Sequence, residues 1–243
     1  MTSQISPATQ KELAPTGKLR VGLNYGNFLL VLRDRPDGTP QGIAPDLARE
    51  LGRRLEMSVE FVKFDAAGKL ADGVKSGAWD VAFLGNEPQR AAEIAFSPAY
   101  LEIPVTYLVP AGSTIQALAD IDREGVRVAV ADKSAYHLFM MRELKNAELV
   151  SADGIDGSYK LFIGSKLDAL AGLKPRLLTD QQKNPGSRVL DGQLTTVQQS
   201  IGVPKSRETA ARYLKEFAQD VKKSGFVAAA IERHKVPGVS VAP

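Results

Sequence analysis

Short apolar runs alternate along the chain with segments in which apolar residues recur every three or four positions. In the first 100 residues, the short runs predict strands at Leu19–Leu23 and Val81–Leu84, and alternation of apolar and polar residues predicts a strand at Val59–Phe64. The helical spacing is carried by Ile43, Leu47, Leu51 and Leu55, and then by Leu70 and Val74. The order strand, helix, strand, helix, strand predicts a parallel sheet with right-handed crossovers.

A second alternation follows an extended segment that begins after Tyr100. Its predicted strands are Val126–Ala131, Glu148–Ser151, Asp168–Leu173 and Arg188–Leu190. Its predicted helices are Ile115–Ile121, Ala135–Lys145, Tyr159–Ile163 and Arg176–Gln182. From Gln193 the chain is extended again, and a long helix with a buried apolar stripe is predicted to start at Ser206. Two alternations predict two α/β lobes.

Each alternation places an aspartate where a buried strand starts, at Asp80 and at Asp168. A carboxylate in that position usually accepts hydrogen bonds from nearby backbone N–H groups. We therefore interpret both residues as structural.

Composition narrows the function classes. The 243 residues are 44% hydrophobic and 24% charged, which is typical of a globular protein. The net charge of +3 is small, and no block of five Lys or Arg residues occurs, so nucleic acid is not an expected partner. The absence of cysteine and the presence of only two histidines argue against a zinc or thiolate site, and we expect no metal and no cofactor.

The first 20 residues are polar and lack the apolar core of 7–15 residues that a secretory signal needs. Either a signal has been removed from this sequence, or the protein stays in the cytoplasm. No run approaches the roughly 20 apolar residues of a membrane span. Residues 1–17 are expected to form a flexible N-terminal arm.

The stretch Gly77–Tyr100 is the strongest candidate for a binding site. Its strand ends at Gly85, polar residues follow, and Arg90 stands where a helical turn begins. Open α/β sheets form ligand crevices at such places, and an arginine fork grips a carboxylate through two hydrogen bonds. The alternative for Arg90 is an ordinary solvated arginine on a helix surface.

Several segments, in their order and spacing, resemble the family 3 extracellular solute-binding proteins, the type 2 periplasmic binding proteins of amino-acid ABC transporters. The segments that carry the resemblance are LRVG, GIAPDLARELGRRL, SGAWDVAFLG, RAAEIAFSPAY, VRVAV and LDAL. The resemblance implies a two-lobed α/β fold, in which each lobe is a mostly parallel sheet flanked by helices. Lobe 1 would comprise residues 18–103 and 197–243, and lobe 2 residues 104–196. Extended segments at Leu101–Thr106 and Gln193–Val197 would form the hinge.

Carried over position by position, the resemblance implies a set of ligand-binding residues. Arg90 matches the arginine that binds the ligand α-carboxylate. Ser134 and Ala135 match residues whose backbone N–H groups complete that carboxylate site, as a helix N-terminus can. The whole candidate set is Tyr25, Asn27, Ala67, Gly85, Asn86, Glu87, Arg90, Ser134, Ala135, Tyr136, Leu173 and Lys174.

The sequence departs from the family pattern at several of these positions. Leu173 stands where many members have an aspartate that pairs with the ligand ammonium, and losing such a buried pair costs several kcal/mol. The other departures are Ala67 for an aromatic residue, Asn27 for a tyrosine, and Gly85 and Glu87 for hydroxyl residues. We hypothesise that Glu87, with Asn86, takes over an ammonium group, and that Lys174 meets a second acidic group.

The expected function is that of a solute-binding protein, not an enzyme. It would capture a small carboxylate-bearing ligand, an amino acid or related organic acid, between two lobes and deliver it to the permease of an ABC transporter. We expect a periplasmic monomer.

Two alternatives stay open, a soluble ligand-sensing module and an enzyme similar to cyclohexadienyl or arogenate dehydratases. Leu173 argues against the enzyme, because a catalytic acid is expected there, and leaves Glu87 as the candidate acid. A hydrolase built on Ser134 and His137 is disfavoured, since a lone histidine in an apolar helix usually packs.

Overall fold

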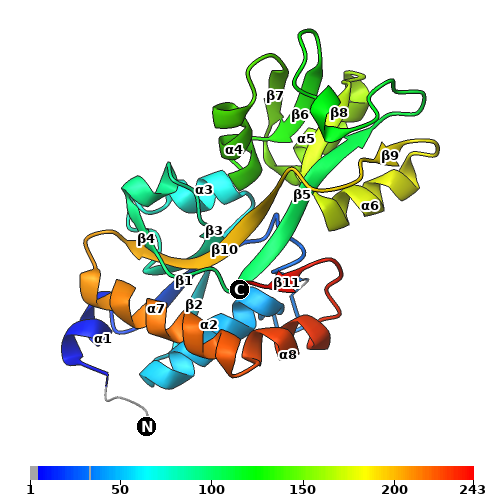
Figure 1. Ribbon diagram of the computed structural model, residues 1–243. Coiled ribbons are helices and arrows are strands. Elements are labelled where there is room, and N and C mark those ends of the chain that lie inside the picture. The colour runs from blue at the N-terminus through cyan, green and yellow to red at the C-terminus, as the bar shows by residue number, and fades with distance from the viewer. Residues whose placement is uncertain (1–4, 33) are drawn as a thin grey trace. The chain divides into compact units, whose positions relative to one another are not determined.

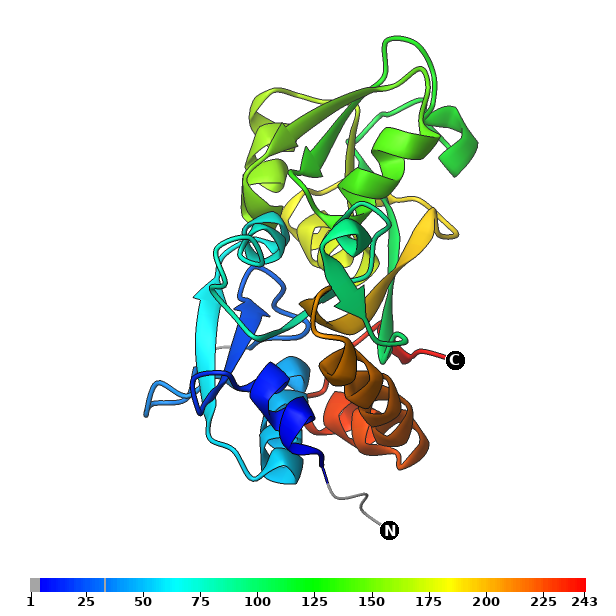
Figure 2. The same cartoon turned by 90° about the vertical axis from the view of Figure 1, so that its left-hand side faces the viewer.

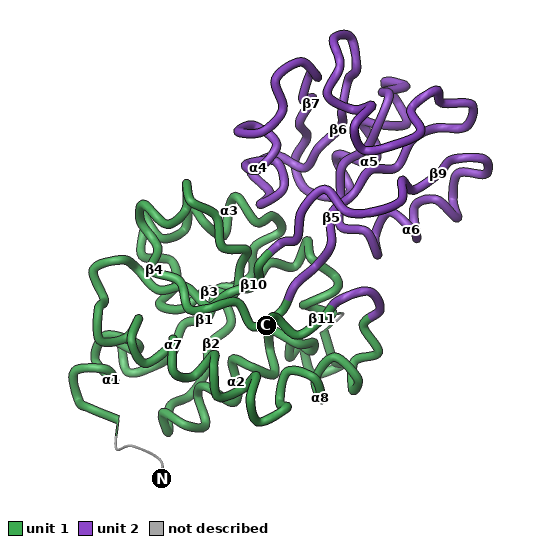
Figure 3. The backbone as a smooth tube through the Cα atoms, in the orientation of Figure 1, with its two compact units in different colours: residues 1–101, 198–236, 240–243 green, residues 102–197, 237–239 purple. Residues whose placement is uncertain are grey.

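The computed structural model describes residues 5–32 and 34–243 (Figure 1). The chain divides into two units (Figure 3). Unit 1 comprises residues 1–101, 198–236 and 240–243, and unit 2 comprises residues 102–197 and 237–239. The strands β5 (Leu101–Val109) and β10 (Thr195–Pro204) carry the chain from one unit into the other.

In unit 1, strand β1 (Leu19–Asn24) lies between β2 (Val59–Phe64) and β3 (Val81–Gly85), and all three run parallel. Strand β10 pairs antiparallel with β3 and also with the short β4 (Ile94–Phe96). Every residue of β3 is buried. A strand that is covered on both faces carries a continuous apolar run, and this is why Val81–Leu84 does not alternate.

The helices of unit 1 follow the apolar spacing of the sequence. They are α1 (Pro7–Leu13), α2 (Ile43–Leu55), α3 (Ala67–Asp72), α7 (Glu208–Lys223) and α8 (Phe226–Arg233). Helix α7 contacts α1 and α8, and α8 contacts α2, so these four form one group (Figures 1 and 2). Helix α3 packs against the strands, over a core that includes Leu70 and Trp79.

In unit 2, strand β6 (Arg127–Ala131) lies between β7 (Glu148–Ala152) and β8 (Ala169–Leu173), again in parallel. Strand β5 pairs antiparallel with β8 and with β9 (Arg188–Val189). The helices are α4 (Ala135–Glu143), α5 (Gly154–Gly164) and α6 (Lys174–Lys183). Phe162 of α5 and Leu177 of α6 reach the core beneath the sheet. The expected α/β class, with mostly parallel sheets flanked by helices, is confirmed.

Most predicted elements form within a few residues of the expected bounds. The helix expected at Ile115–Ile121 is an exception, because only the single turn η2 (Leu118–Asp120) is helical. The carboxylate of Asp120 accepts the N–H groups of Gln116 and Ala117, and this capped turn holds the preceding residues out of a helix. Helix α8 and strands β4 and β11 (Ser240–Val241) were not expected.

The N-terminal arm differs from its prediction. Residues 1–4 of the expected arm lie outside the described residues, but the segment behind them forms α1, and Leu13 is fully buried. The Glu12 carboxylate accepts the backbone N–H of Ala210 at 2.8 Å, and the Glu12 carbonyl accepts from Nη1 of Arg207. Helix α7 has no side-chain cap from its own N-cap residue, so Glu12 satisfies one of its N–H groups instead.

None of the helices in residues 5–32 and 34–243 combines the length and the apolar content that a membrane crossing requires.

Asp80 and Asp168 make the same pair of hydrogen bonds in the two units, each with an arginine. Asp80 donates its N–H to the Arg20 carbonyl and accepts the Arg20 N–H at its carboxylate. Asp168 exchanges the same two bonds with Arg127. The structural interpretation of both aspartates is therefore confirmed. They differ in burial, since the Asp80 side chain is fully buried and also bonds Arg207, whereas 40% of the Asp168 side chain is exposed.

We predict that Asp80→Asn lowers the free energy of unfolding by about 3 kcal/mol, because it removes the fully buried counter-charge of two partly buried arginines, Arg20 and Arg207. The matched control is Asp168→Asn, which should cost less than about 1 kcal/mol because that carboxylate is partly in water. Urea unfolding measures both, with circular dichroism reporting the whole chain and the single tryptophan, Trp79, reporting unit 1. Equal costs at the two sites would contradict the prediction.

Glu50 links charges on helix α2. Its carboxylate accepts from Nε of Arg53 at 2.8 Å and from Nε of Arg54 at 2.7 Å, and Arg54 also bridges to Asp220 of α7. The hydrogen bonds from Arg53 are the largest cause that lowers the pKa of Glu50 from its ordinary 4.5 to about 2. Because the folded-state pKa is depressed, this stabilisation is present above pH 4.5 and is lost as the pH falls through about 2.

We predict that Glu50→Gln costs roughly 1–3 kcal/mol of unfolding free energy at pH 7. The cost is less than the lowered pKa of Glu50 alone would give, because Arg53 is largely in water, which screens its attraction to Glu50. The cost should shrink below pH 4.5 and vanish near pH 2. Thermal unfolding of both proteins across pH 2–7 measures the difference. A cost that stays constant over this range would show that the ionised carboxylate is not its source.

Candidate functional site

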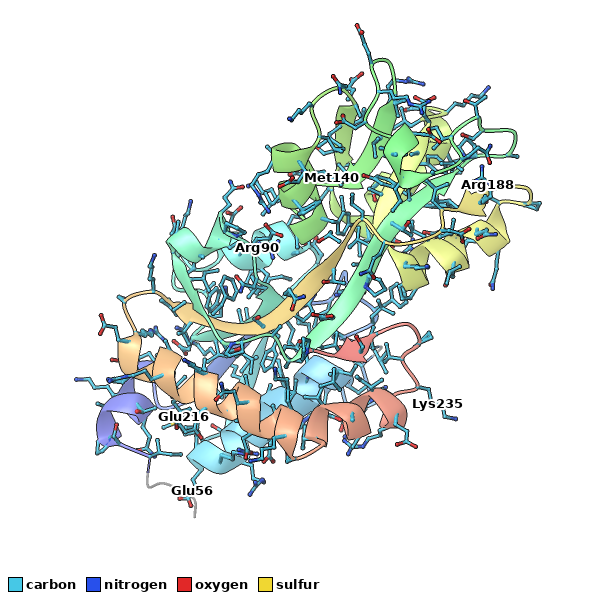
Figure 4. The ribbon with its side chains drawn as sticks, viewed as in Figure 1. Glu56, Arg90, Met140, Arg188, Glu216 and Lys235 are labelled. Carbon is cyan, nitrogen blue, oxygen red and sulfur yellow. The ribbon has the colours of Figure 1, made fainter. Side chains whose placement is uncertain are left out.

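Arg90 lies on the turn that follows the carboxyl end of β3. It opens the single turn η1 (Arg90–Ala92), and its Nη1 donates to the carbonyl of Gly85 at 2.7 Å. The residue is 7% exposed, so the solvated-surface alternative is wrong (Figure 4). Burial lowers the pKa of Arg90 to about 10, while the charges of Glu87 and Asp72 act in the opposite direction. The guanidinium is therefore a buried cation that depends on neighbouring acceptors.

Gly85, Asn86 and Glu87 connect β3 to this arginine. Gly85 is the last residue of β3 and faces Gln199 of β10, and the N–H of Asn86 donates to the Gln198 carbonyl at 2.8 Å. The Asn86 residue is exposed, whereas Glu87 is 9% exposed. The Glu87 carbonyl accepts the N–H of Ala91 at 3.0 Å, and this bond closes a turn that contains both Glu87 and Arg90. The carboxylate and the guanidinium thus belong to one fixed segment.

Tyr25 and Asn27 lie on the loop after β1. The hydroxyl of Tyr25 donates to Asp34 at 2.9 Å, and Nζ of Lys63 lies 4.9 Å from the centre of its ring. Burial is the largest cause that raises the pKa of Tyr25. Asn27 is buried, and its side-chain oxygen accepts the N–H of Leu29 at 3.2 Å. Asn27 therefore shapes this loop, and Asp34 and Lys63 are partners of Tyr25 that sequence reasoning missed.

The parallel strands of unit 1 bring these residues to one edge of the sheet. Strands β1, β2 and β3 end in register, with Asn24 beside Phe64 and Leu23 beside Phe83. The half-buried Ala67 begins α3 just after β2, and Gly26 approaches the Asp65 carbonyl so closely that a Cβ there would lie 2.3 Å from it. The unit 1 candidates thus gather at the carboxyl edge, where open α/β sheets bind ligands.

In unit 2, Ser134 begins helix α4. It is the N-cap, and its Oγ accepts the N–H of His137 at 3.1 Å. The next two residues, Ala135 and Tyr136, donate their N–H groups to no acceptor within residues 5–32 and 34–243. Such N–H groups at a helix start attract an anion.

Tyr136, Leu173 and Lys174 complete the unit 2 candidates. Burial raises the pKa of Tyr136 to about 12, while the Ser134 hydroxyl and the Arg176 charge act to lower it. Leu173 is buried, ends β8 and is the N-cap of α6, where it provides no side-chain cap. Lys174 is the first residue of α6, and its Nζ donates to the Gly192 carbonyl at 3.3 Å. Because β6 and β8 are parallel neighbours, both groups lie at the carboxyl edge of the unit 2 sheet.

His137 has a structural part in this loop. Its Nδ1 accepts the backbone N–H of Lys133 at 3.0 Å and lies 3.5 Å from an Asp132 oxygen. Burial is the largest cause that lowers the pKa of His137. Since Nδ1 must be unprotonated to accept a hydrogen bond, His137 is a neutral residue that holds the start of α4, as the packing interpretation expects.

The overall fold is shared with solved bacterial binding proteins. A solute receptor for L-cysteine of Neisseria gonorrhoeae is 20% identical with a TM-score of 0.78, and the match covers 96% of this chain and 95% of that one. An amino acid ABC transporter substrate-binding protein of Streptococcus pneumoniae, bound to L-arginine, is 18% identical with a TM-score of 0.75, over 96% and 99% of the two chains.

A third structure is an ancestral amino acid-binding protein described as a precursor of cyclohexadienyl dehydratase. It is 21% identical with a TM-score of 0.74, and the match covers 93% of this chain and 98% of that chain. At these identities the structures establish a common fold.

The sequence itself also matches a family description. Residues 19–236 match the bacterial extracellular solute-binding proteins, family 3, and this range includes every candidate residue named above. Only the segment that carries α1 and the last residues of the chain lie outside the match. The chain therefore belongs to the bacterial extracellular solute-binding proteins, family 3.

Proposed function

We propose that this protein binds a small carboxylate-bearing ligand, an amino acid or a related organic acid, for an ABC transporter. The observation that carries the proposal is Arg90. An arginine residue that is 7% exposed, at the carboxyl edge of a parallel sheet, is a costly feature from which a protein gains little unless the charge is used. A planar fork of N–H donors suits a carboxylate.

The start of α4 supports the same ligand chemistry from unit 2. Ala135 and Tyr136 offer N–H groups next to the N-cap Ser134, and the helix dipole adds a partial positive charge there. No acidic residue belongs to the candidate set in this unit, and Lys174 adds a cation at the start of α6. These features favour a negatively charged group of the ligand.

The transport role follows from the family rather than from the site. We propose that the protein acts in the periplasm as a monomer, and that the permease of an ABC transporter is its partner. The similar structures include amino acid ABC transporter substrate-binding proteins, and one of them holds L-arginine. Closure of two lobes on the ligand, which the sequence resemblance implied, stays a prediction.

We further propose that the protein is not an enzyme. A dehydratase would need an acid that reaches the departing hydroxyl of its substrate. Leu173 provides no such group, and the remaining acid of the candidate set, Glu87, shares its turn with the buried cation of Arg90. The candidate residues therefore favour binding over catalysis.

We predict that a true ligand raises the melting temperature by several degrees. At a hundred times its dissociation constant, a ligand adds about 2.7 kcal/mol of stability, and each kcal/mol is worth about 2–4 °C at this chain length. The panel should contain L-arginine, L-lysine, L-cysteine, succinate, pyruvate, phenylpyruvate and glycine betaine. Arg90→Lys should abolish most of the shift, since an ammonium keeps the charge but loses the two-pronged geometry.

The matched control is Arg123→Lys, which changes an exposed arginine of unit 2 in the same way. Its ligand response should equal that of the wild type. A panel in which no carboxylate shifts the transition would contradict the proposal. Turnover of prephenate or arogenate by the same preparation would instead support the dehydratase alternative.

A further inference from the structure

The carboxylate of Glu87 is built into the anion site around Arg90. The Glu87 carbonyl accepts the N–H of Ala91 at 3.0 Å, and η1 begins at Arg90, so the two charged residues share one tight turn. The bond from Ala91 back to Glu87 closes one α-type turn, in which side chains three residues apart are neighbours. Both residues are more than nine-tenths buried. A negative charge is thus fixed beside the cation that would bind a ligand carboxylate.

Glu87 is not the only acidic residue whose charge acts on Arg90. Asp72, the last residue of α3, acts on it as well, and the carbonyl of Gly85 accepts a hydrogen bond from its Nη1. Within unit 1, Arg90 is therefore surrounded by acceptors and by two carboxylates before any ligand arrives. Two acidic residues of unit 1 thus act on the guanidinium to which a ligand carboxylate would bind.

This charge balance affects two classes of ligand differently. A simple carboxylate would bring a further negative charge next to Glu87, and uncompensated charge is expensive where water is excluded. A ligand with an ammonium group beside its carboxylate would bring both signs. Its carboxylate would meet Arg90 and its ammonium would meet Glu87, so that each buried charge has an opposite partner.

We propose that Glu87 is a specificity-determining residue, which favours ligands that carry an ammonium group next to the carboxylate and disfavours simple organic anions. This inference rests on the proposed function, because it assumes that a carboxylate binds at Arg90. Specificity of this kind combines an attraction to one ligand with a repulsion of its competitor. Leu173, an apolar residue at the end of β8, contributes neither term.

The test compares pairs of ligands that differ only in the ammonium group next to the carboxylate. L-lysine is paired with 6-aminohexanoate, L-cysteine with 3-mercaptopropionate, and L-arginine with 5-guanidinopentanoate. Isothermal titration calorimetry gives the ratio of the two dissociation constants for each pair, in the wild type and in Glu87→Gln. The wild type should prefer the amino acid of a pair that it binds, and Glu87→Gln should reduce that preference by about tenfold or more.

Two opposite changes should produce this loss of preference. In Glu87→Gln the amino acid should bind more weakly, because its ammonium has lost an ionised acceptor, and the deaminated acid should bind more tightly, because a repulsion is gone. The matched control is Glu93→Gln, six residues further along the chain, where the side chain is 48% exposed and bridges to Lys75. The control should leave every ratio unchanged.

An unchanged ratio in folded Glu87→Gln would overturn the inference and leave the proposed function standing. If the variant does not fold, the wild-type measurements still test the inference. Equal affinity for both members of a pair would show that the site does not select for an ammonium group next to the carboxylate, and would overturn it. Binding of none of the six compounds, together with no response to succinate, pyruvate, phenylpyruvate or glycine betaine, would contradict the proposed function itself.

Discussion

The feature on which the rest of the site depends is a cation held out of water. An arginine at this depth is stable only where its surroundings supply acceptors, and the chain supplies them from the segment that carries it. Strand β3 is fully buried and ends at Gly85, whose carbonyl receives a bond from Arg90, and the same turn contributes Glu87. The position of the site is therefore set by where a buried strand stops and the chain must turn.

A second constraint explains why the candidate residues of each unit gather at one edge of that unit's own sheet. In each unit an aspartate at a strand start donates its N–H to the carbonyl of an arginine on the neighbouring parallel strand and accepts that arginine's N–H at its carboxylate. The pairs are Asp80 with Arg20 and Asp168 with Arg127. These paired hydrogen bonds fix the register at the amino end of the strands. With the strands in register, their carboxyl ends reach the same edge, and the loops that follow them are free to vary in sequence.

The sequence predicted the central strands β3 and β8 well, because their continuous apolar runs reflect burial on both faces. It did not predict that α1 docks, because the decisive contact, Glu12 with the N–H of Ala210, joins residues that are almost 200 positions apart. Long-range polar contacts leave no periodic trace. The same holds for the Tyr25 hydroxyl bond to Asp34 and for the effect of Asp72 on Arg90. Arg90 itself was indicated by the end of its strand and by the resemblance.

The two units differ in the kind of charge that they offer. The candidate residues at the unit 2 edge offer N–H groups at the start of α4 and the cation of Lys174, and these groups favour a negative charge. The unit 1 edge offers a guanidinium together with acids, and so it can accommodate both signs. An aspartate at position 173 would make unit 2 resemble unit 1. With leucine there, the proposed specificity places recognition of a positive group on unit 1, where Glu87 is a buried acid.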